Sequence, residues 1–362
     1  MGLGFEIISS PEKLVALTDE IEANVRKFPG SFFYSPCWLR TFQTVLSQDK
    51  KLVHIIGRDE AGALRGTVHF SLVRTSFLKL SHPQVLALMG TRSVVSPEHL
   101  EFPIDPAVRD DWLRFLESYI KDRMRECAFA VFDCVAENAG NIEACLNHLR
   151  SSGFRISREL QNICPYFDLP ETFDELMERY SANMRKIIRR SLKRGQDTFR
   201  FTDHKSIGGI ETVFAEARRL HNLSREQKSE IGSFDRAGYV DFHHELVRCL
   251  GDTDQVYFRF LLAGDRPVAF RYGFLVDGIY YDYQTGYDPA YAHGRPGFVI
   301  LAMVVRDLIS RGAKQFDFLR GDEDYKRHWA DKEHKTYRYF IFPPGLKSHI
   351  YSAIWRLYHG LK

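Results

Sequence analysis

The sequence predicts an α/β (α+β) protein of two similar domains, each with a mixed, mostly antiparallel sheet flanked by helices. Segments with strand-like and helix-like apolar periodicity alternate along the chain. The order of strand, tight turn and strand occurs twice, at 52–72 and at 256–287. The 362 residues are long for one core and comfortable for two. These observations favour two copies of one fold.

The first half alternates short strands and helices. Ser35-Pro36 indicates a helix start, because proline is well tolerated in the first turn of a helix. Two β-rich runs surround Asp59-Glu60-Ala61-Gly62, which predicts a hairpin. The predicted strands are 5–9, 52–58, 63–75, 128–135 and 162–169, and the predicted helices are 11–28, 36–46, 109–127 and 141–153.

The second half begins with a helix predicted over 171–195, in which apolar residues recur at three- and four-residue spacing until Gly195 ends it. Gly264-Asp265 and Asp277-Gly278 are hairpin turn signals between three strands. The predicted helices that remain are 209–225, 236–250 and 298–312, and the predicted strands that remain are 314–320 and 336–342.

We therefore expect four segments. They are an N-terminal domain at 1–170, a basic connecting helix at 171–200, a C-terminal domain at 201–345 and an amphipathic C-terminal helix at 346–362. The last segment has one apolar stripe flanked by tryptophan, tyrosine and basic residues. It fits either docking on its own domain or a membrane interface.

A Gly/Pro loop before a long apolar helix predicts an anion site. Gly294, Pro296 and Gly297 leave backbone N–H groups free at a helix N-terminus, where anions bind. His293 and Arg295 add side-chain donors beside the loop. No GxxxxGK[ST] motif follows, so a pyrophosphate suits this site better than a nucleoside triphosphate.

A second basic feature runs from Arg179 to Arg200, where eight basic residues face only Asp197. A charge run is usually a solvated face, but eight basic residues are more than solubility needs. The anionic ligands that it could meet include a CoA phosphate, a tRNA backbone or an acidic lipid head group. The segment lacks the interleaved aromatic residues of a single-strand binder, which ranks tRNA lowest. A net charge of +3 gives no argument for DNA binding.

The sequence shows no sign of a metal site or a membrane span. The six cysteines contain no CxxC pair. No run approaches eighteen apolar residues, and the N-terminus lacks the basic and apolar regions of a signal peptide. We expect a cytoplasmic protein, with a peripheral contact to the inner face of the membrane as an option. Its oligomeric state is left open.

Three motifs carry a family resemblance. They are Leu220-His221, Pro296-Gly297 at the start of a long helix, and FDFLRGDEDYKRHW at 316–329. Together they resemble the GNAT acyltransferases of the CelD-like branch, which is related to the Fem peptidyltransferases. The resemblance covers 181–342 well and the first 170 residues loosely. It implies a tandem GNAT fold.

The resemblance also implies a donor. An acyl-CoA would be a co-substrate rather than a permanently bound cofactor. Its pyrophosphate would lie at His293, Gly294, Arg295, Pro296, Gly297 and Phe298. The acyl thioester would follow the preceding strand, where Tyr281 and Tyr283 would contact substrate. Alternating tyrosines on a strand also serve packing alone.

The catalytic residues implied are His221, Asp317 and Lys326. An imidazole titrates near neutrality, as deprotonation of an amine requires. Lys326 would stabilise developing negative charge, and Arg320, Tyr325 and Trp329 would contact substrate. The alternative for the acidic-basic run at 322–327 is a solvated helix cap.

We expect an N-acyltransferase that moves an acyl group from acyl-CoA to an amine of a cell-envelope precursor. The acceptor would be a lipid-like amine such as a sphingoid base, or an amino sugar of a polysaccharide. One alternative is a Fem-like aminoacyl transferase that uses aminoacyl-tRNA. The other is a non-catalytic module that binds lipid or polysaccharide.

Overall fold

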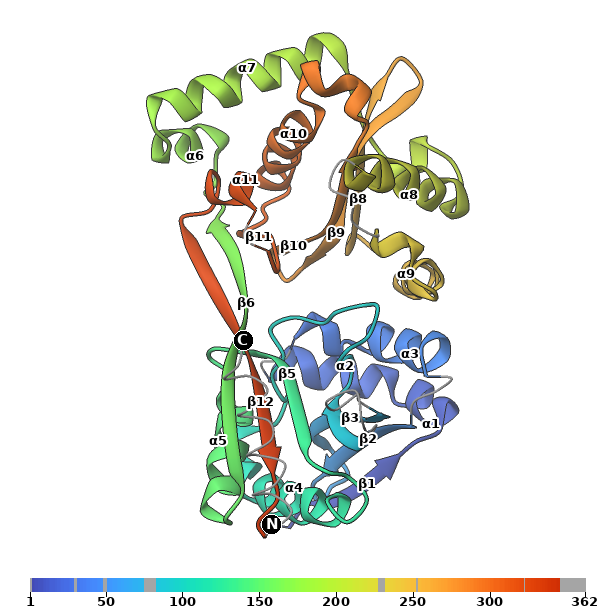
Figure 1. Ribbon diagram of the computed structural model, residues 1–362, viewed down its shortest axis with the longest axis vertical. Helices are drawn as coiled ribbons and strands as arrows, with labels where there is room; N and C mark the ends of the chain where they lie inside the picture. Colours follow the sequence, from blue (N-terminus) through green and yellow to red (C-terminus); the bar gives the residue numbers. More distant parts are fainter. Residues whose placement is uncertain are drawn as a thin grey trace. The chain divides into compact units, whose positions relative to one another are not determined.

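The computed structural model describes residues 2–28, 31–47, 51–74, 83–226, 232–251, 253–321 and 323–345. The helix predicted at 346–362 lies outside the described residues. The chain divides into two compact units (Figure 1). Unit 1 comprises Met1–Asn162 and Lys335–Lys362, and unit 2 comprises Ile163–His334.

Unit 1 is built on a mixed sheet with the strand order β1-β2-β3-β4-β5-β12. All neighbouring pairs are antiparallel except β4 and β5, which are parallel. The strands are β1 (Gly4–Ile8), β2 (Lys51–Arg58), β3 (Leu64–Arg74), β4 (Gln84–Leu88), β5 (Ala130–Ala136) and the end of β12 (Lys332–Phe342). The helices are α1 (Pro11–Ala16), α2 (Thr18–Lys27), α3 (Pro36–Val45), α4 (Arg109–Arg123) and α5 (Gly140–Ser151).

Unit 2 repeats this plan with the strand order β7-β8-β9-β10-β11-β6, in which only β10 and β11 are parallel. The strands are the end of β6 (Arg155–Asp168), β7 (Arg200–Asp203), β8 (Val256–Ala263), β9 (Arg266–Val276), β10 (Ile279–Tyr287) and β11 (Gln315–Asp317). The helices are α6 (Phe173–Arg179), α7 (Ala182–Thr198), α8 (Ile210–Glu226), α9 (Tyr239–Leu250), α10 (Pro296–Ser310) and α11 (Asp324–Arg327).

The two units share one pairing pattern, in which four antiparallel strands precede a parallel fifth. This confirms the predicted fold class and the predicted hairpins of both halves. The sixth strand of each unit comes from the other half of the sequence, because β12 ends beside β5 and β6 ends beside β11. The units therefore differ from the linear division predicted at residues 170, 200 and 345.

The segment at 171–195, predicted as one helix, forms two. α6 ends at Arg179, and Tyr180 has an extended backbone with φ −92° and ψ 155°. The Ser181 hydroxyl then accepts a hydrogen bond from the Met184 N–H and begins α7. The apolar spacing continues across the break because both helices bury a face in the core of unit 2.

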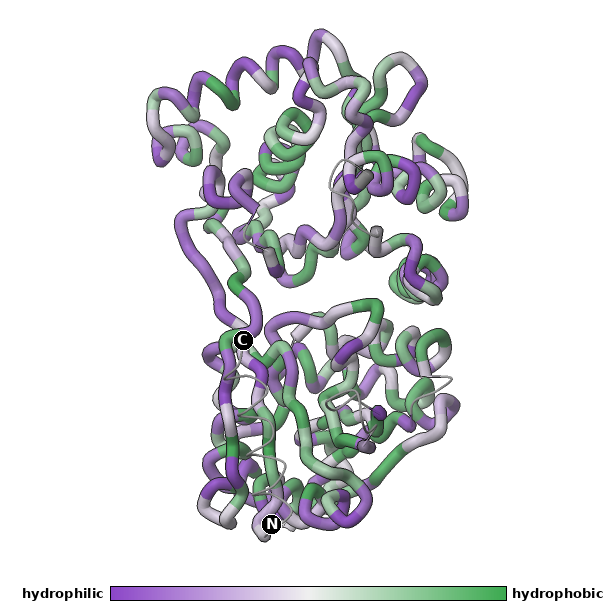
Figure 2. The backbone as a smooth tube through the Cα atoms, in the orientation of Figure 1, coloured by the Kyte–Doolittle hydropathy of each residue, from purple (hydrophilic) through white to green (hydrophobic). Residues whose placement is uncertain are grey.

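α10 is the central helix of unit 2. It is apolar on nearly all sides (Figure 2), and it packs between the sheet and α7. α7 approaches closely at Gly195, where an added Cβ would lie 2.7 Å from Val299 Cγ1. The predicted connecting helix therefore covers the core of unit 2.

α8 approaches β10 in the same way. A Cβ added at Gly286 would lie 2.6 Å from the backbone nitrogen of His221 and 2.7 Å from its Cα. Backbone atoms cannot move aside as a flexible side chain does, so this contact requires glycine.

We predict that Gly286→Ala destabilises the protein by about 1–3 kcal/mol through overpacking. Gly140→Ala is the matched control, because a Cβ at that helix start meets nothing within 4 Å. Denaturant midpoints of the two variants check this. Equal midpoints would contradict the close contact between α8 and β10.

Candidate functional site

The pairing of β10 with β11 ends after three residue pairs. Ile279–Tyr281 pair with Gln315–Asp317, and β11 ends there. β10 continues to Tyr287 with a shift of register between Asp282 and Gln284. In the described residues no strand pairs with this edge of β10 beyond Tyr281. The backbone from there to Tyr287 spans six residues, about 20 Å, and the Thr285 carbonyl within it accepts a hydrogen bond from His221.

A buried ion pair stabilises β10 where its register shifts. Arg271 of β9 donates to the Asp282 carboxylate, and both side chains are buried. The Tyr280 hydroxyl donates to the other carboxylate oxygen of Asp282 at 3.2 Å. The Arg271 guanidinium also lies 5.8 Å from the centre of the Tyr325 ring. Because an unpaired buried charge is costly, this pair holds β10 in one register.

The turn after β11, Asp317–Gly321, has a constrained backbone. Leu319 is buried and has φ 53°, a left-handed conformation that costs a non-glycine residue about 1–3 kcal/mol. The Asp317 carboxylate, also buried, accepts the Leu319 N–H at 2.7 Å. Gly321 has φ 119°, which only glycine adopts readily. This turn is held in place by specific contacts and is a candidate functional element.

Lys326 supplies further contacts to this turn. Its ammonium group donates to the carbonyl of Phe318 at 3.3 Å and to that of Arg320 at 2.7 Å. Glu323 completes the set with an ion pair at 3.0 Å. Lys326 is 4% exposed, so it lies inside the fold rather than in a solvated helix cap. The structure places Asp317, Arg320 and Lys326, predicted as site residues, together around this turn.

The predicted tyrosines lie in two places. Burial, followed by the nearby Asp317 carboxylate, raises the pKa of Tyr281, and burial raises the pKa of Tyr325. Both phenols are therefore protonated at neutral pH and act as hydrogen-bond donors. Tyr283 instead packs in an aromatic cluster, 5.0 Å from the His243 ring and 5.7 Å from the Phe274 ring.

The N-terminus of α10 offers fewer backbone donors than predicted. Arg295 caps the helix with φ 54°, and its carbonyl accepts the N–H groups of both Phe298 and Val299 at 3.0 Å. Pro296 has no N–H. In the first turn of α10 as described, the Gly297 N–H is the donor that has no backbone acceptor.

Basic side chains surround this helix start. Arg295 and His293 are exposed, and Arg194 of α7 donates to the His293 carbonyl at 3.0 Å. Gly294 has a packing role, because a Cβ there would lie 2.9 Å from the Phe199 ring. A Cβ on Gly297 would lie 3.4 Å from the Tyr287 ring, which joins the helix start to the end of β10. The predicted anion site therefore lies at one end of the open edge of β10.

Trp329, predicted as a substrate contact, lies in the core. Its ring centre is 5.6 Å from that of Phe298 and 5.8 Å from that of Tyr180. The Tyr180 hydroxyl donates to the Trp329 carbonyl at 3.1 Å. The indole therefore connects the start of α10 with the end of α11 by packing.

Both ring nitrogens of His221 contact backbone atoms. Nδ1 donates to the Thr285 carbonyl of β10 at 3.2 Å, and Nε2 accepts the Ser233 N–H at 3.4 Å. The ring is buried, and this burial lowers its pKa. His221 is thus a neutral imidazole that ties α8 to β10, and in this geometry neither nitrogen is open to a substrate.

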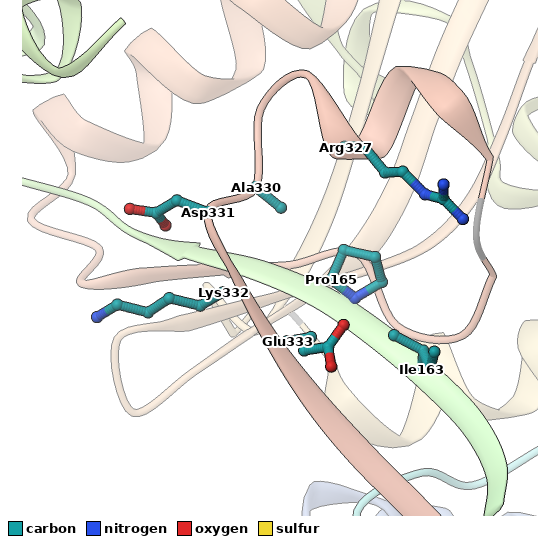
Figure 3. Close-up of a pocket in the computed structure, with 7 residues that line it drawn as sticks. All are labelled: Ile163, Pro165, Arg327, Ala330, Asp331, Lys332 and Glu333. Atoms are coloured by element: carbon teal, nitrogen blue, oxygen red, sulfur yellow. The ribbon is translucent and has the colours of Figure 1, made fainter.

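A pocket of about 330 Å³ lies on unit 2 (Figure 3). It is lined by Ile163, Pro165, Arg327, Ala330, Asp331, Lys332 and Glu333. It adjoins the turn after β11, because the carbonyls of Ile163 and Pro165 accept the N–H groups of Gly321 and Phe318 at 3.3 and 3.0 Å. Figure 3 shows Arg327 and Lys332 pointing to opposite sides, and Lys332 pairs with Asp168.

Sequence reasoning missed this pocket and the Arg271–Asp282 pair. The sequence contains a sign of the pair, since opposite charges occupy two β-rich runs on either side of the Asp277-Gly278 turn. It contains no sign of the pocket, because β6 and the start of β12 are far apart in sequence. In the described residues no three His, Cys, Asp or Glu side chains gather to hold a metal ion. No described helix has the length and apolar character needed to cross a membrane.

Comparisons with known proteins agree with this architecture. Residues 169–327 match the family described as the acetyltransferase (GNAT) domain. No curated protein sequence matches the chain.

Three solved structures are similar over nearly the whole chain. FemX is 12% identical with a TM-score of 0.63, over 96% of this chain and 99% of that one. A conserved protein of unknown function from Bacteroides thetaiotaomicron VPI-5482 is 13% identical with a TM-score of 0.58, over 94% and 99%. L-PGS from Bacillus licheniformis is 13% identical with a TM-score of 0.54, over 96% of both chains.

The class of the protein follows from these findings. Residues 169–327, which contain the open edge of β10, α10 and the turn after β11, are a GNAT domain with an acyltransferase fold. The chain as a whole shares its two-unit fold with FemX. Both findings confirm the resemblance seen in the motifs at 220–221, 296–297 and 316–329.

We predict that Lys326→Met destabilises the protein by about 1–3 kcal/mol, because it leaves the carbonyls of Phe318 and Arg320 without their donor. Lys121→Met is the control, since that lysine forms a half-exposed ion pair with Glu117 and its loss costs about 0.5 kcal/mol or less. Thermal melting distinguishes them. Indistinguishable melting temperatures would show that Lys326 does not hold the turn.

Proposed function

We propose that this protein is an N-acyltransferase that moves an acyl group from acyl-CoA to the amine of a cell-envelope precursor. One observation carries the proposal, which is the open edge of β10 between the turn after β11 and the N-terminus of α10. An extended amide-containing arm can hydrogen-bond to such an edge as an added strand would. A pyrophosphate at the α10 N-terminus would anchor that arm.

The donor phosphates would bind at the start of α10. The Gly297 N–H and the helix dipole favour an anion there. Arg295 and His293 are exposed beside it, and Arg194 reaches the same loop. The acyl thioester would then lie near Tyr281 and Tyr325. Their protonated hydroxyls would donate to the thioester carbonyl or to the departing sulfur.

The acceptor would bind in the pocket beside the turn after β11. The carboxylates of Asp331 and Glu333 suit an ammonium or amine group. The apolar surface of Ile163, Pro165 and Ala330 suits a hydrocarbon segment. These features favour a lipid-like amine over an amino sugar.

In the reaction the amine nitrogen attacks the thioester carbonyl, the C–N bond forms and the C–S bond breaks. The proton lost by the amine passes to water, and the CoA thiolate takes up a proton from a tyrosine hydroxyl that solvent reprotonates. Asp317 and Lys326 would act by holding the turn after β11, and His221 by holding β10. No covalent intermediate on the enzyme is needed.

An aminoacyl-tRNA donor is the second candidate, because the exposed side chains of α7 form a basic surface next to the donor loop. Turnover that ribonuclease abolishes would identify that donor. Turnover with CoA thioesters that ribonuclease leaves intact would support acyl-CoA. Mass spectrometry of products from a mixture of CoA thioesters and candidate amines would identify the acceptor.

We predict that CoA at a hundred times its dissociation constant stabilises the protein by about 2.7 kcal/mol. Gly297→Trp should remove this stabilisation, because the indole covers the Gly297 N–H and meets the Tyr287 ring. Gly297→Ala is the matched control, since its Cβ makes an ordinary contact of 3.4 Å. Thermal shift and isothermal titration measure the effect. CoA binding by the tryptophan variant at wild-type strength would move the donor site elsewhere.

We predict that the acid limb of kcat/KM follows the pKa of the acceptor amine and survives His221→Gln. Burial holds the pKa of His221 below its ordinary value of 6.5. The folded protein therefore favours the neutral imidazole. The contribution of neutral His221 to the free energy of unfolding is lost as the pH falls below about 6.5. Profiles for two amines of different pKa test this. If the limb disappears in the variant and the rate falls about 10²-fold, His221 is the general base.

A further inference from the structure

The outward face of α7 carries a dense set of cations. Lys186, Arg189, Arg190, Lys193 and Arg194 are all exposed on this helix. Asp197 is its only acidic residue. At 100° per residue these cations cover an arc of about 140° of the helix circumference. That arc is opposite the buried side, which is formed by Met184, Ile188, Ser191, Leu192 and Gly195.

Four of these cations have no carboxylate partner among the residues that the structure describes. In the part of the chain that the structure describes, no carboxylate forms an ion pair with Lys186, Arg189, Arg190 or Lys193. Other surface cations of unit 2 do have such partners, for example Arg218 with Asp235 at 2.7 Å and Arg248 with Glu211 at 3.2 Å. The α7 face is therefore available to an anionic partner outside the chain.

The cationic face extends beyond the donor loop. Arg194 lies beside that loop through its bond to the His293 carbonyl. Lys186 lies eight residues away, which is about 12 Å along the helix axis. A pyrophosphate at the α10 N-terminus would meet the Arg194 end, and the rest of the face suits an extended anionic surface.

We propose that this face of α7 docks the protein on a membrane surface rich in anionic lipid. A helix with cations along one face lies flat on a plane of anionic head groups, and each Lys or Arg near that surface adds to the attraction. α7 contains no aromatic residue that could stack on nucleic acid bases. It also exposes no large apolar side chain, so the contact is electrostatic and reversible. This inference does not depend on the proposed reaction.

The test is co-sedimentation of the full chain with phospholipid vesicles. We expect binding to vesicles of phosphatidylcholine with about 30% phosphatidylglycerol, an anionic lipid. That binding should be at least tenfold stronger than binding to phosphatidylcholine alone. It should weaken steeply between 0.05 and 0.5 M NaCl, because salt screens the charges over about 10 Å or less.

The matched variants carry three charge reversals each. Lys186→Glu/Arg189→Glu/Lys193→Glu alters the α7 face. Arg236→Glu/Arg248→Glu/Lys314→Glu makes the same change in net charge at exposed positions of unit 2 outside α7. We expect the first variant to lose tenfold or more in vesicle binding, and the second to stay within threefold of wild type. The melting temperature of the first variant should equal that of the wild type, which shows that the variant folds.

Three results would overturn the proposal. They are equal binding to neutral and anionic vesicles, wild-type vesicle binding by the folded α7 variant, and duplex RNA binding that depends on the α7 cations in a protein that does not bind vesicles. The second result would assign membrane contact to another segment. The third would assign the face to a nucleic acid partner.

Discussion

The separation of β10 from β11 is the constraint on which the candidate site depends. Three parallel residue pairs fix the two strands together, and β11 then ends in a turn with a left-handed Leu319. Beyond these three pairs β11 no longer supports β10, so other contacts must hold β10 in position. The Arg271–Asp282 pair holds it from the β9 side, and α8 holds it through Gly286 and His221. On the other side, Asp317 and Lys326 hold the turn after β11 through bonds to its backbone.

Several residues that we predicted from the sequence as catalytic hold backbone groups in position in the structure. Lys326, Asp317 and His221 each satisfy backbone donors or acceptors of the elements beside β10. Leaving a buried polar group unpaired is costly in free energy. The hydrogen bonds to these backbone groups therefore fix the three side chains in place. The groups with freedom to meet a ligand are exposed ones, such as Arg295 and His293. In the proposed reaction Lys326, Asp317 and His221 would therefore contribute by placement rather than by proton transfer.

The sequence predicted the fold because its signals are local. The turns at Gly264-Asp265 and Asp277-Gly278, the proline at the start of α10 and the apolar periodicity of the helices each act over a few residues. The opening between β10 and β11 could not be predicted, because it depends on where the pairing of a three-residue strand stops. The pocket could not be predicted, since Ile163 and Glu333 are brought together only by the fold. The break between α6 and α7 at Tyr180 could not be predicted, because the apolar spacing continues across it.

The exchange of sixth strands between the halves of the sequence has a consequence for biosynthesis. The edge of β5 finds its partner in residues 336–341, close to the end of the described chain. Translation proceeds from the N-terminus at about 5–20 residues per second. Unit 1 therefore spends roughly the time needed to make 200 further residues with an unpaired strand edge, a state prone to wrong pairing. The protein therefore completes unit 1 only after the whole of unit 2, residues 163–334, has been made.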